Sequence, residues 1–101
     1  MLSKEDFAAT VGYQGALAVV DKRVRSKMKK IAPMDALKEG MFRPGFAAAL
    51  YDSQVNNNHQ VLTEAVEFLS KVFNSQLTLD QAKRMLGIQR VPQEIEKVIL
   101  L

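Results

Sequence analysis

Apolar residues along this chain recur every three to four positions in most segments, and strict alternation of apolar and polar residues is nearly absent. An α-helix completes a turn every 3.6 residues, so this pattern predicts helices rather than strands. Glycine, proline and asparagine fall between the periodic segments, where they end one helix and let the next begin. The predicted fold is therefore all-α, a compact bundle of about five to seven short helices.

The first half of the chain is predicted to contain four helices. Ser3 is a suitable N-cap for a short first helix. A second helix is predicted at about residues 14–30, and Pro33 prevents it from continuing. A brief helix at 34–39 follows and ends at Gly40, a natural left-handed C-cap, and a fourth helix opens at Pro44. The apolar stripe of the second helix consists of Leu17, Val20, Val24, Met28 and Ile31.

The second half of the chain is predicted to contain the most apolar helix, at residues 58–73, after a turn at 56–58. Because its apolar stripe is broad enough to contact several neighbours, we expect this helix to lie at the centre of the bundle. Thr78 and Gln81 form a capping box for a further helix. A last helix is predicted to begin near Pro92.

The composition favours one soluble, globular domain that spans residues 1–101. Of the 101 residues, 48% are hydrophobic and 25% are charged, and no repeat or linker divides the chain. The absence of cysteine excludes a disulfide scaffold and fits a reducing compartment, so we expect a cytoplasmic protein. The apolar run at 7–20 is too short to span a bilayer. Glu5 and Asp6 precede it, which argues against a secretion signal.

The sequence offers little chemistry for an enzyme. His59 is the one histidine, so no pair of histidine or cysteine ligands can build a zinc site. Same-face carboxylate pairs occur at Glu64 and Glu67 and at Asp35 and Glu39, but such pairs usually form solvated helix edges. No nucleophile, phosphate-binding or dinucleotide-binding motif is present. We therefore predict a non-enzymatic protein with no catalytic residue, metal, cofactor or small-molecule substrate.

One segment, "LTLDQAKRMLGI" at residues 77–88, resembles the first helix and turn of bacterial helix-turn-helix domains. That resemblance implies a recognition helix immediately afterwards, with exposed bases facing a DNA groove. The sequence departs from the pattern there, because the predicted helix presents Gln93, Glu94 and Glu96, with Lys97 as its one base. Carboxylates would repel phosphates, so we interpret the match as a helix-cap pattern.

Positive charge is concentrated in one part of the chain. The net charge is +3, yet residues 21–43 alone carry eight bases and three acids. On a helix, Val24 and Met28 would face inward and the bases would form one outward face. We predict this face as a candidate site for an anionic partner; the alternative is an ordinary solvated helix surface. The predicted site consists of Lys22, Arg23, Arg25, Lys27, Lys29 and Lys30.

Two functions are consistent with these observations. The first is a small helical protein–protein interaction or structural module that self-associates as a homo-oligomer, through apolar surface at 44–53, 58–73 and the two leucines at 100–101. The alternative is a nucleic-acid-associated protein whose basic face contacts phosphates, extended by Lys38 and Arg43. The basic face carries no aromatic residue for base stacking, so such contacts would not depend on sequence.

Overall fold

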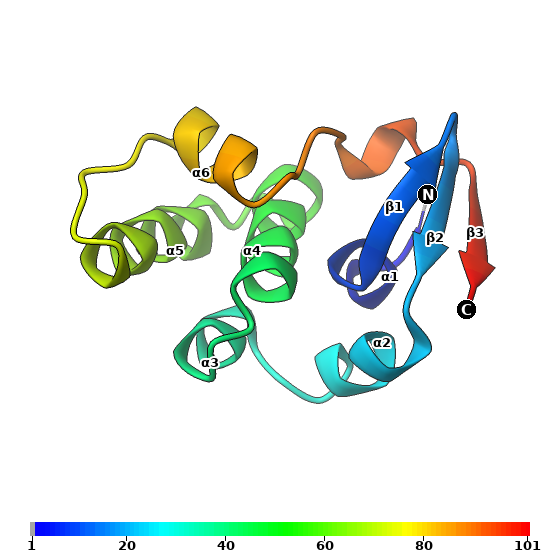
Figure 1. The fold of residues 1–101 in the computed structure, drawn as a ribbon, viewed down its shortest axis with the longest axis horizontal. Helices are drawn as coiled ribbons and strands as arrows, with labels where there is room; N and C mark the ends of the chain where they lie inside the picture. Colours follow the sequence, from blue (N-terminus) through cyan, green and yellow to red (C-terminus); the bar gives the residue numbers. More distant parts are fainter. Residues whose placement is uncertain (1) are drawn as a thin grey trace.

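A computed structural model describes residues 2–101. Within this range the chain forms six α-helices and a three-stranded sheet (Figure 1), so the all-α prediction is wrong and the fold is α/β. The elements are α1 (Lys4–Ala8), β1 (Thr10–Gln14), β2 (Leu17–Val20), α2 (Lys22–Met28), α3 (Pro33–Lys38), α4 (Phe42–Asn56), α5 (His59–Val72), α6 (Leu79–Met85), a 3-10 turn η1 (Pro92–Glu94) and β3 (Lys97–Leu100).

The sheet combines a hairpin with a strand from the other end of the chain. β1 and β2 pair antiparallel around Gly15, whose φ of 60° suits the tight turn. β3 pairs parallel with β2, which gives the order β1-β2-β3. The sheet stands at one end of the molecule, and β3 is its outer strand (Figure 1). The predicted helix at 14–30 is therefore wrong over residues 14–20, which form the end of β1, the turn and β2.

The predicted last helix is also wrong. Pro92 begins only a three-residue 3-10 turn, and residues 97–100 form β3 instead. Val98 and Ile99 are β-branched and suit a strand, and they lie opposite Ala18 and Val19 of β2. This pairing joins residues about 80 positions apart, so no local period could reveal it. Because no regular helix follows α6 within the described residues, the segment at 77–88 is not the first part of a helix-turn-helix.

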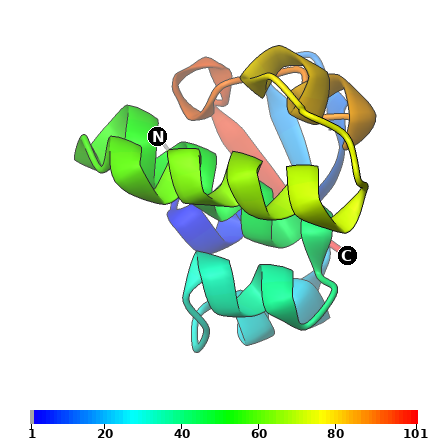
Figure 2. The same cartoon turned by 90° about the vertical axis from the view of Figure 1, so that its left-hand side faces the viewer.

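The core centres on α4, whereas the sequence pattern placed the central helix at 58–73. Every residue from Gly45 to Tyr51 is buried, and α4 packs against α1, α3 and α5. Small residues permit this: a Cβ on Gly45 would meet the Pro33 carbonyl oxygen at 3.0 Å. α5 lies across α4 (Figure 2) and leaves Val72 and Phe73 exposed. The broad apolar stripe of α5 therefore indicates that one face of this helix packs on the core. It does not place α5 at the centre of the core.

Several local predictions are confirmed. Ser3 caps α1 by accepting from the Asp6 N–H at 3.2 Å. Gly40 follows α3 with a left-handed φ of 86°. Both bonds of the capping box between Thr78 and Gln81 are present, at 2.9 and 3.2 Å. These features depend only on neighbours within a few residues, so the sequence predicts them well.

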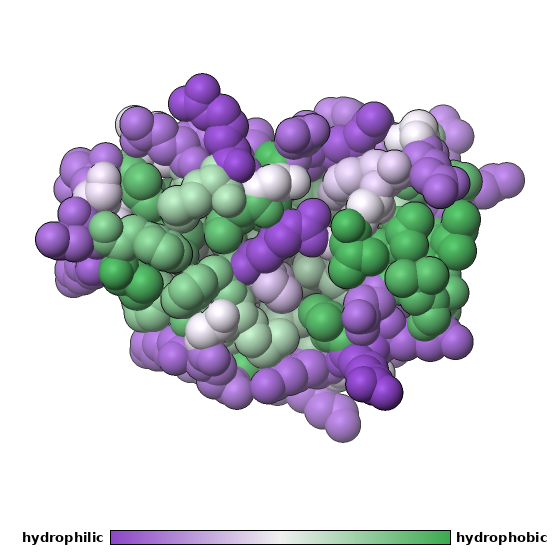
Figure 3. All heavy atoms as spheres, viewed as in Figure 1, coloured by the Kyte–Doolittle hydropathy of each residue, from purple (hydrophilic) through white to green (hydrophobic). Residues whose placement is uncertain are grey.

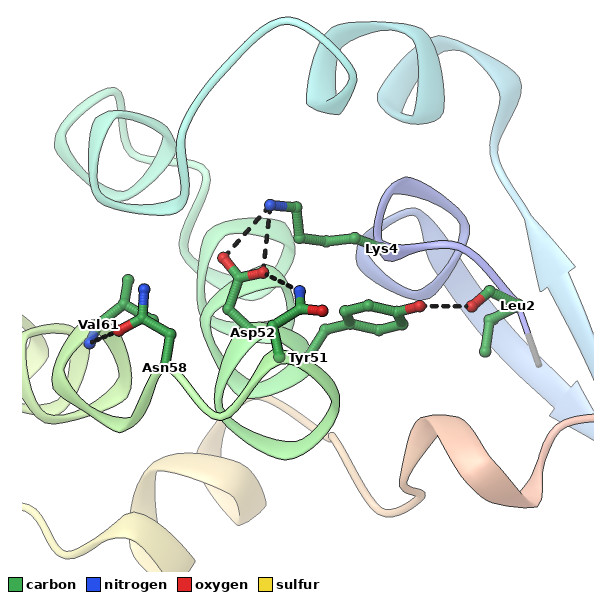
Figure 4. Close-up of polar contacts among 7 residues, drawn as sticks. Leu2, Lys4, Tyr51, Asp52, Asn58 and Val61 are labelled. Carbon is green, nitrogen blue, oxygen red and sulfur yellow. Dashed lines mark hydrogen bonds and ion pairs between the residues drawn. The ribbon is translucent and has the colours of Figure 1, made fainter.

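Polar contacts tie the start of the chain to α4 (Figure 4). The Lys4 ammonium lies 3.2 Å from the Asp52 carboxylate. Beside this pair, the buried Tyr51 hydroxyl donates to the Leu2 carbonyl at 2.9 Å. Burial raises the pKa of the Tyr51 phenol above its usual 10.0, and the carboxylates of Glu5 and Asp52 raise it further. The phenol therefore stabilises the fold in its protonated, donating form.

Replacing Tyr51 with phenylalanine should lower the free energy of unfolding by about 1 kcal/mol near neutral pH, because the Leu2 carbonyl loses its donor. A raised folded-state pKa adds stability that is complete below pH 10 and is lost as the pH rises through the folded pKa. The variant should therefore lose less stability above pH 10 than the parent does. Urea unfolding followed by circular dichroism at pH 8 and pH 11 measures both effects. An equal loss in parent and variant would contradict this role.

Candidate interaction surface

The structure places the predicted basic site on and just after α2. Asp21 caps this helix by accepting from the N–H groups of Arg23 and Val24, at 2.8 and 3.1 Å. Val24 is half-buried and Met28 is buried, as the sequence pattern predicts for the inward stripe. The bases consequently point away from the core, and the six predicted residues share one region of the surface.

Two of the six bases serve the fold itself. Arg25 forms an ion pair with Asp6, which ties α2 to α1. Lys27 lies 3.3 Å from Glu39, just beyond α3, and both side chains are half-exposed. Within residues 2–101 the other four bases have no ion-pair partner and are exposed. The bases that remain for an external partner are Lys22, Arg23, Lys29 and Lys30.

Arg43, which the nucleic-acid hypothesis added to this surface, points elsewhere. Its guanidinium donates to the Leu86 carbonyl at 3.0 Å and to the Thr10 carbonyl. These bonds join α4 to β1 and to the end of α6. Arg43 is therefore a structural residue, whereas Lys38 is exposed at the end of α3.

The start of α2 borders a shallow hollow at the far end of β3. This open hollow has a volume of about 380 Å³. Because β3 runs parallel to β2, its last residues lie beside the point where β2 leads into α2. Exposed apolar and basic side chains thus meet at one corner of the molecule. The hollow is lined by Asp21, Lys22, Arg23 and Leu101.

The free edge of β3 is the second part of this surface. The Leu101 N–H donates to the Val20 carbonyl at 3.0 Å. At the start of the strand, the Ala16 carbonyl accepts from the Glu96 N–H at 2.9 Å and from the Lys97 N–H at 3.5 Å. Successive strand residues point their backbone groups to opposite sides, so Val98 and Leu100 direct N–H and C=O groups away from β2. Hydrophobic side chains also gather over the strands (Figure 3). The exposed fractions are 41% for Ile99, 46% for Leu100 and 66% for Leu101.

The opposite edge of the sheet, in β1, is protected. The register shifts between Thr10 and Gly12, and such a bulge discourages further pairing. The Arg43 guanidinium donates a hydrogen bond to the Thr10 carbonyl, so this carbonyl is not free to pair with another strand. The Arg90 guanidinium lies 5.5 Å from the centre of the Tyr13 ring. β3 lacks such features: Lys97, at its start, is the only charged residue in the strand. The sheet therefore has one open edge, in β3.

A serine–histidine contact was not predicted from the sequence. The Ser53 hydroxyl lies 2.7 Å from His59 Nδ1, and these residues flank the turn between α4 and α5. Ser53 is only 5% exposed, and none of the four open hollows described in the structure is lined by either residue. The contact is best explained as a bond that fixes this turn. The i, i+6 spacing across an asparagine turn is too irregular to have signalled it.

Comparisons of the chain with protein-family profiles, with curated proteins and with solved structures find no match. Across residues 2–101, no helix combines the length and the apolar character needed to cross a bilayer. No cluster of three or more acidic, histidine or cysteine residues suited to a metal ion occurs in that range. A functional argument for this chain therefore depends on its surface, and above all on the β3 edge and the adjoining bases.

Proposed function

We propose that this chain is a non-enzymatic protein-interaction module that self-associates by strand addition at the free edge of β3. One observation carries the proposal: β3 presents unpaired backbone groups together with exposed apolar side chains, at the unprotected edge of the sheet. Such an edge is a template for pairing with another strand. Pairing would satisfy the outward N–H and C=O groups and remove apolar surface from water at the same time.

A second copy is the favoured occupant because, within residues 2–101, one carboxylate and two bases without ion-pair partners lie at opposite ends of β3. Glu96 precedes Lys97 at the start of the strand, whereas Lys22 and Arg23 follow Asp21 beside its far end. Antiparallel addition of an identical strand would bring Glu96 of each copy towards Lys22 and Arg23 of the other. Self-association was also the first hypothesis from the sequence, which included Leu100 and Leu101 in the apolar surface expected to form the contact. They do not pack into the core of the single chain.

The nucleic-acid alternative has weaker support. Four exposed bases remain available after two are paired within the fold. If all four contacted phosphates, the slope of log affinity against log salt on duplex DNA would be about −3 to −4. These bases are divided between the start of α2 and the segment after it. No aromatic side chain lies among them to stack on bases.

Light-scattering chromatography tests the proposal directly. The parent should show about twice the 11.3 kDa mass of one chain. Leu100→Pro should give a monomer, because its N–H points outward and proline removes that donor without disturbing the bonds to β2. Leu100→Val retains the N–H and the apolar side chain, so it should remain a dimer. Circular dichroism checks that both variants are folded.

Two results would overturn the proposal. One is a monomeric parent across roughly a hundredfold range of concentration, up to about 1 mM. The other is a Leu100→Pro variant that associates as well as the parent, since its association would then use another surface. Absorbance at 260 and 280 nm examines the alternative in the same run. With two tyrosines and no tryptophan, the protein absorbs so weakly at 280 nm that bound nucleic acid would dominate the spectrum.

A further inference from the structure

We infer that two copies of this chain pair their β3 strands antiparallel about a twofold axis at Ile99, with Glu96 of each copy facing Lys22 and Arg23 of the other. The inference rests on the proposed self-association through β3 and adds the register and the residues that meet. Its three supports are the direction of the β3 backbone groups, the side-chain faces of the strand and the distribution of charge at its ends.

The backbone groups select one register. Val98 and Leu100 point their N–H and C=O groups outward, because Lys97 and Leu101 donate inward to β2. In an antiparallel ladder, residues with outward groups pair with each other. Twofold symmetry then places Val98 of one copy opposite Leu100 of the second copy, and the reverse. This register uses the outward groups of both residues and provides about four hydrogen bonds between the two backbones.

The same register places Ile99 of the two copies directly opposite each other. Such a non-hydrogen-bonded pair has its Cα atoms about 4.5 Å apart, so the two side chains touch. Val98 packs against the core, and hence Ile99 and Leu101 lie on the outer face of the sheet. On that face Leu101 of one copy would lie beside the aliphatic stem of Lys97 from the second copy, whose ammonium stays in water. Apolar side chains that are exposed in the single chain would cover one another.

The charges at the strand ends fit this arrangement. Glu96 lies immediately before β3, and antiparallel addition carries it to the far end of the other β3. That end borders the hollow lined by Lys22 and Arg23. The partner strand would lie about 10 Å from β2, two strand spacings away, within reach of these long side chains. The twofold axis creates this contact twice.

The neighbouring charges leave these residues available. The Asp21 carboxylate, which also lines the hollow, already accepts two N–H groups of its own helix. Glu94 lies 4.0 Å from Arg90. Within residues 2–101, Glu96, Lys22 and Arg23 have no ion-pair partner. The excess of bases at the start of α2, unexplained within a single chain, would therefore be matched by a carboxylate from the second copy.

A disulfide trap tests the register, since the parent chain contains no cysteine. Ile99→Cys should form a covalent dimer under mild oxidation, because the predicted Cα separation falls within the 4.4–6.8 Å that a disulfide spans. Leu101→Cys is the matched control on the same face. Leu101 is 66% exposed and Ile99 is 41% exposed, so random collisions between chains would form disulfides more readily at position 101. In the inferred register, however, residue 101 of each copy lies opposite residue 97 of the other. The two copies of residue 101 are therefore four positions apart along the strands, too far for a disulfide.

Non-reducing electrophoresis reads the result. A covalent dimer from Ile99→Cys, with little from Leu101→Cys, supports the register. Equal yields, or a higher yield from Leu101→Cys, overturn it. If the parent is a dimer by light scattering and Ile99→Cys does not crosslink, the inferred arrangement fails while self-association stands. A monomeric parent overturns both.

A charge exchange tests the ends of the interface. The double variant Lys22→Glu with Arg23→Glu should raise the dimer dissociation constant about tenfold to a hundredfold at low salt. Adding Glu96→Lys to it should restore most of the affinity. Lys29→Glu with Lys30→Glu makes the same change in charge at the other end of α2 and should leave the constant within about threefold of the parent. If both double variants weaken the dimer equally, or if Glu96→Lys restores nothing, the pairing is wrong.

Discussion

Replacing Phe46 with alanine should lower the free energy of unfolding by about 3–5 kcal/mol, enough to unfold much of a marginally stable domain. Phe46 is 0% exposed and belongs to the main core cluster. It lies on α4, which packs against four other helices, so little of the cavity left by the ring can be closed by movement of one neighbour. Urea unfolding followed by circular dichroism measures the loss.

Phe73→Ala is the matched control, because it removes the same ring from the end of α5. Phe73 is 43% exposed and contacts Phe42 edge-to-face, with 5.5 Å between the ring centres. Its loss should cost about 1–2 kcal/mol. The comparison also examines the architecture, since the sequence pattern placed the centre of the core at residues 58–73. A larger loss for Phe73→Ala than for Phe46→Ala would contradict the central position of α4.

Caps and turns were predictable because their physical causes are local. Thr78 and Gln81 satisfy each other's backbone within one turn, and Gly40 adopts a conformation that other residues avoid. Helix α5 was predicted to within about a residue at each end. A pattern that depends on three or four neighbouring residues is fully contained in the sequence, so these elements could be derived without the tertiary fold.

The strands were not predictable in the same way. Residues 17–20 are apolar throughout, and such a short run fits a buried strand as well as a helix. What selects the strand is pairing on both sides, with β1 nearby and with β3 about 80 residues away. The buried positions were identified only in part: of the five residues in the predicted stripe, Val20 and Met28 are buried and the other three are half-buried, while the fully buried Ala18 was not in the stripe. A helical period cannot describe the alternating faces of a strand, so the stripe fits the burial in α2 better than the burial in β2.

The candidate site was predictable in part for a related reason. Charge on the outward face of residues 22–30 follows from spacing alone, and α2 confirms that its bases point outward. Sequence spacing does not show which of these bases form ion pairs within the fold. Asp6 pairs with Arg25, for example, only because α1 packs on α2. The edge of β3 could not be recognised at all while residues 92–101 were predicted to be helical. Both parts of the candidate surface therefore depend on contacts between distant segments.

Arg43 gives the second large expected effect. Arg43→Met should lower the free energy of unfolding by about 2–4 kcal/mol, because it removes a charged donor shared by the Leu86 and Thr10 carbonyls. Methionine retains much of the apolar stem, so the loss reports mainly on the guanidinium. Arg43→Lys should recover little of it, since a single ammonium does not reproduce the fork that reaches both carbonyls.

Lys38→Met supplies the control, because it removes the same unit of charge from an exposed position at the end of α3. It should change stability by no more than about 0.5 kcal/mol. If Arg43→Met is equally mild, the two carbonyls do not depend on Arg43, and its position in the basic segment would need another explanation. If only Arg43→Met unfolds the protein, one base assigned to an external partner by sequence spacing instead holds the hairpin and α6 against α4. A loss of binding in that variant would then report lost structure, and the interface must be tested at Lys22, Arg23 and Glu96.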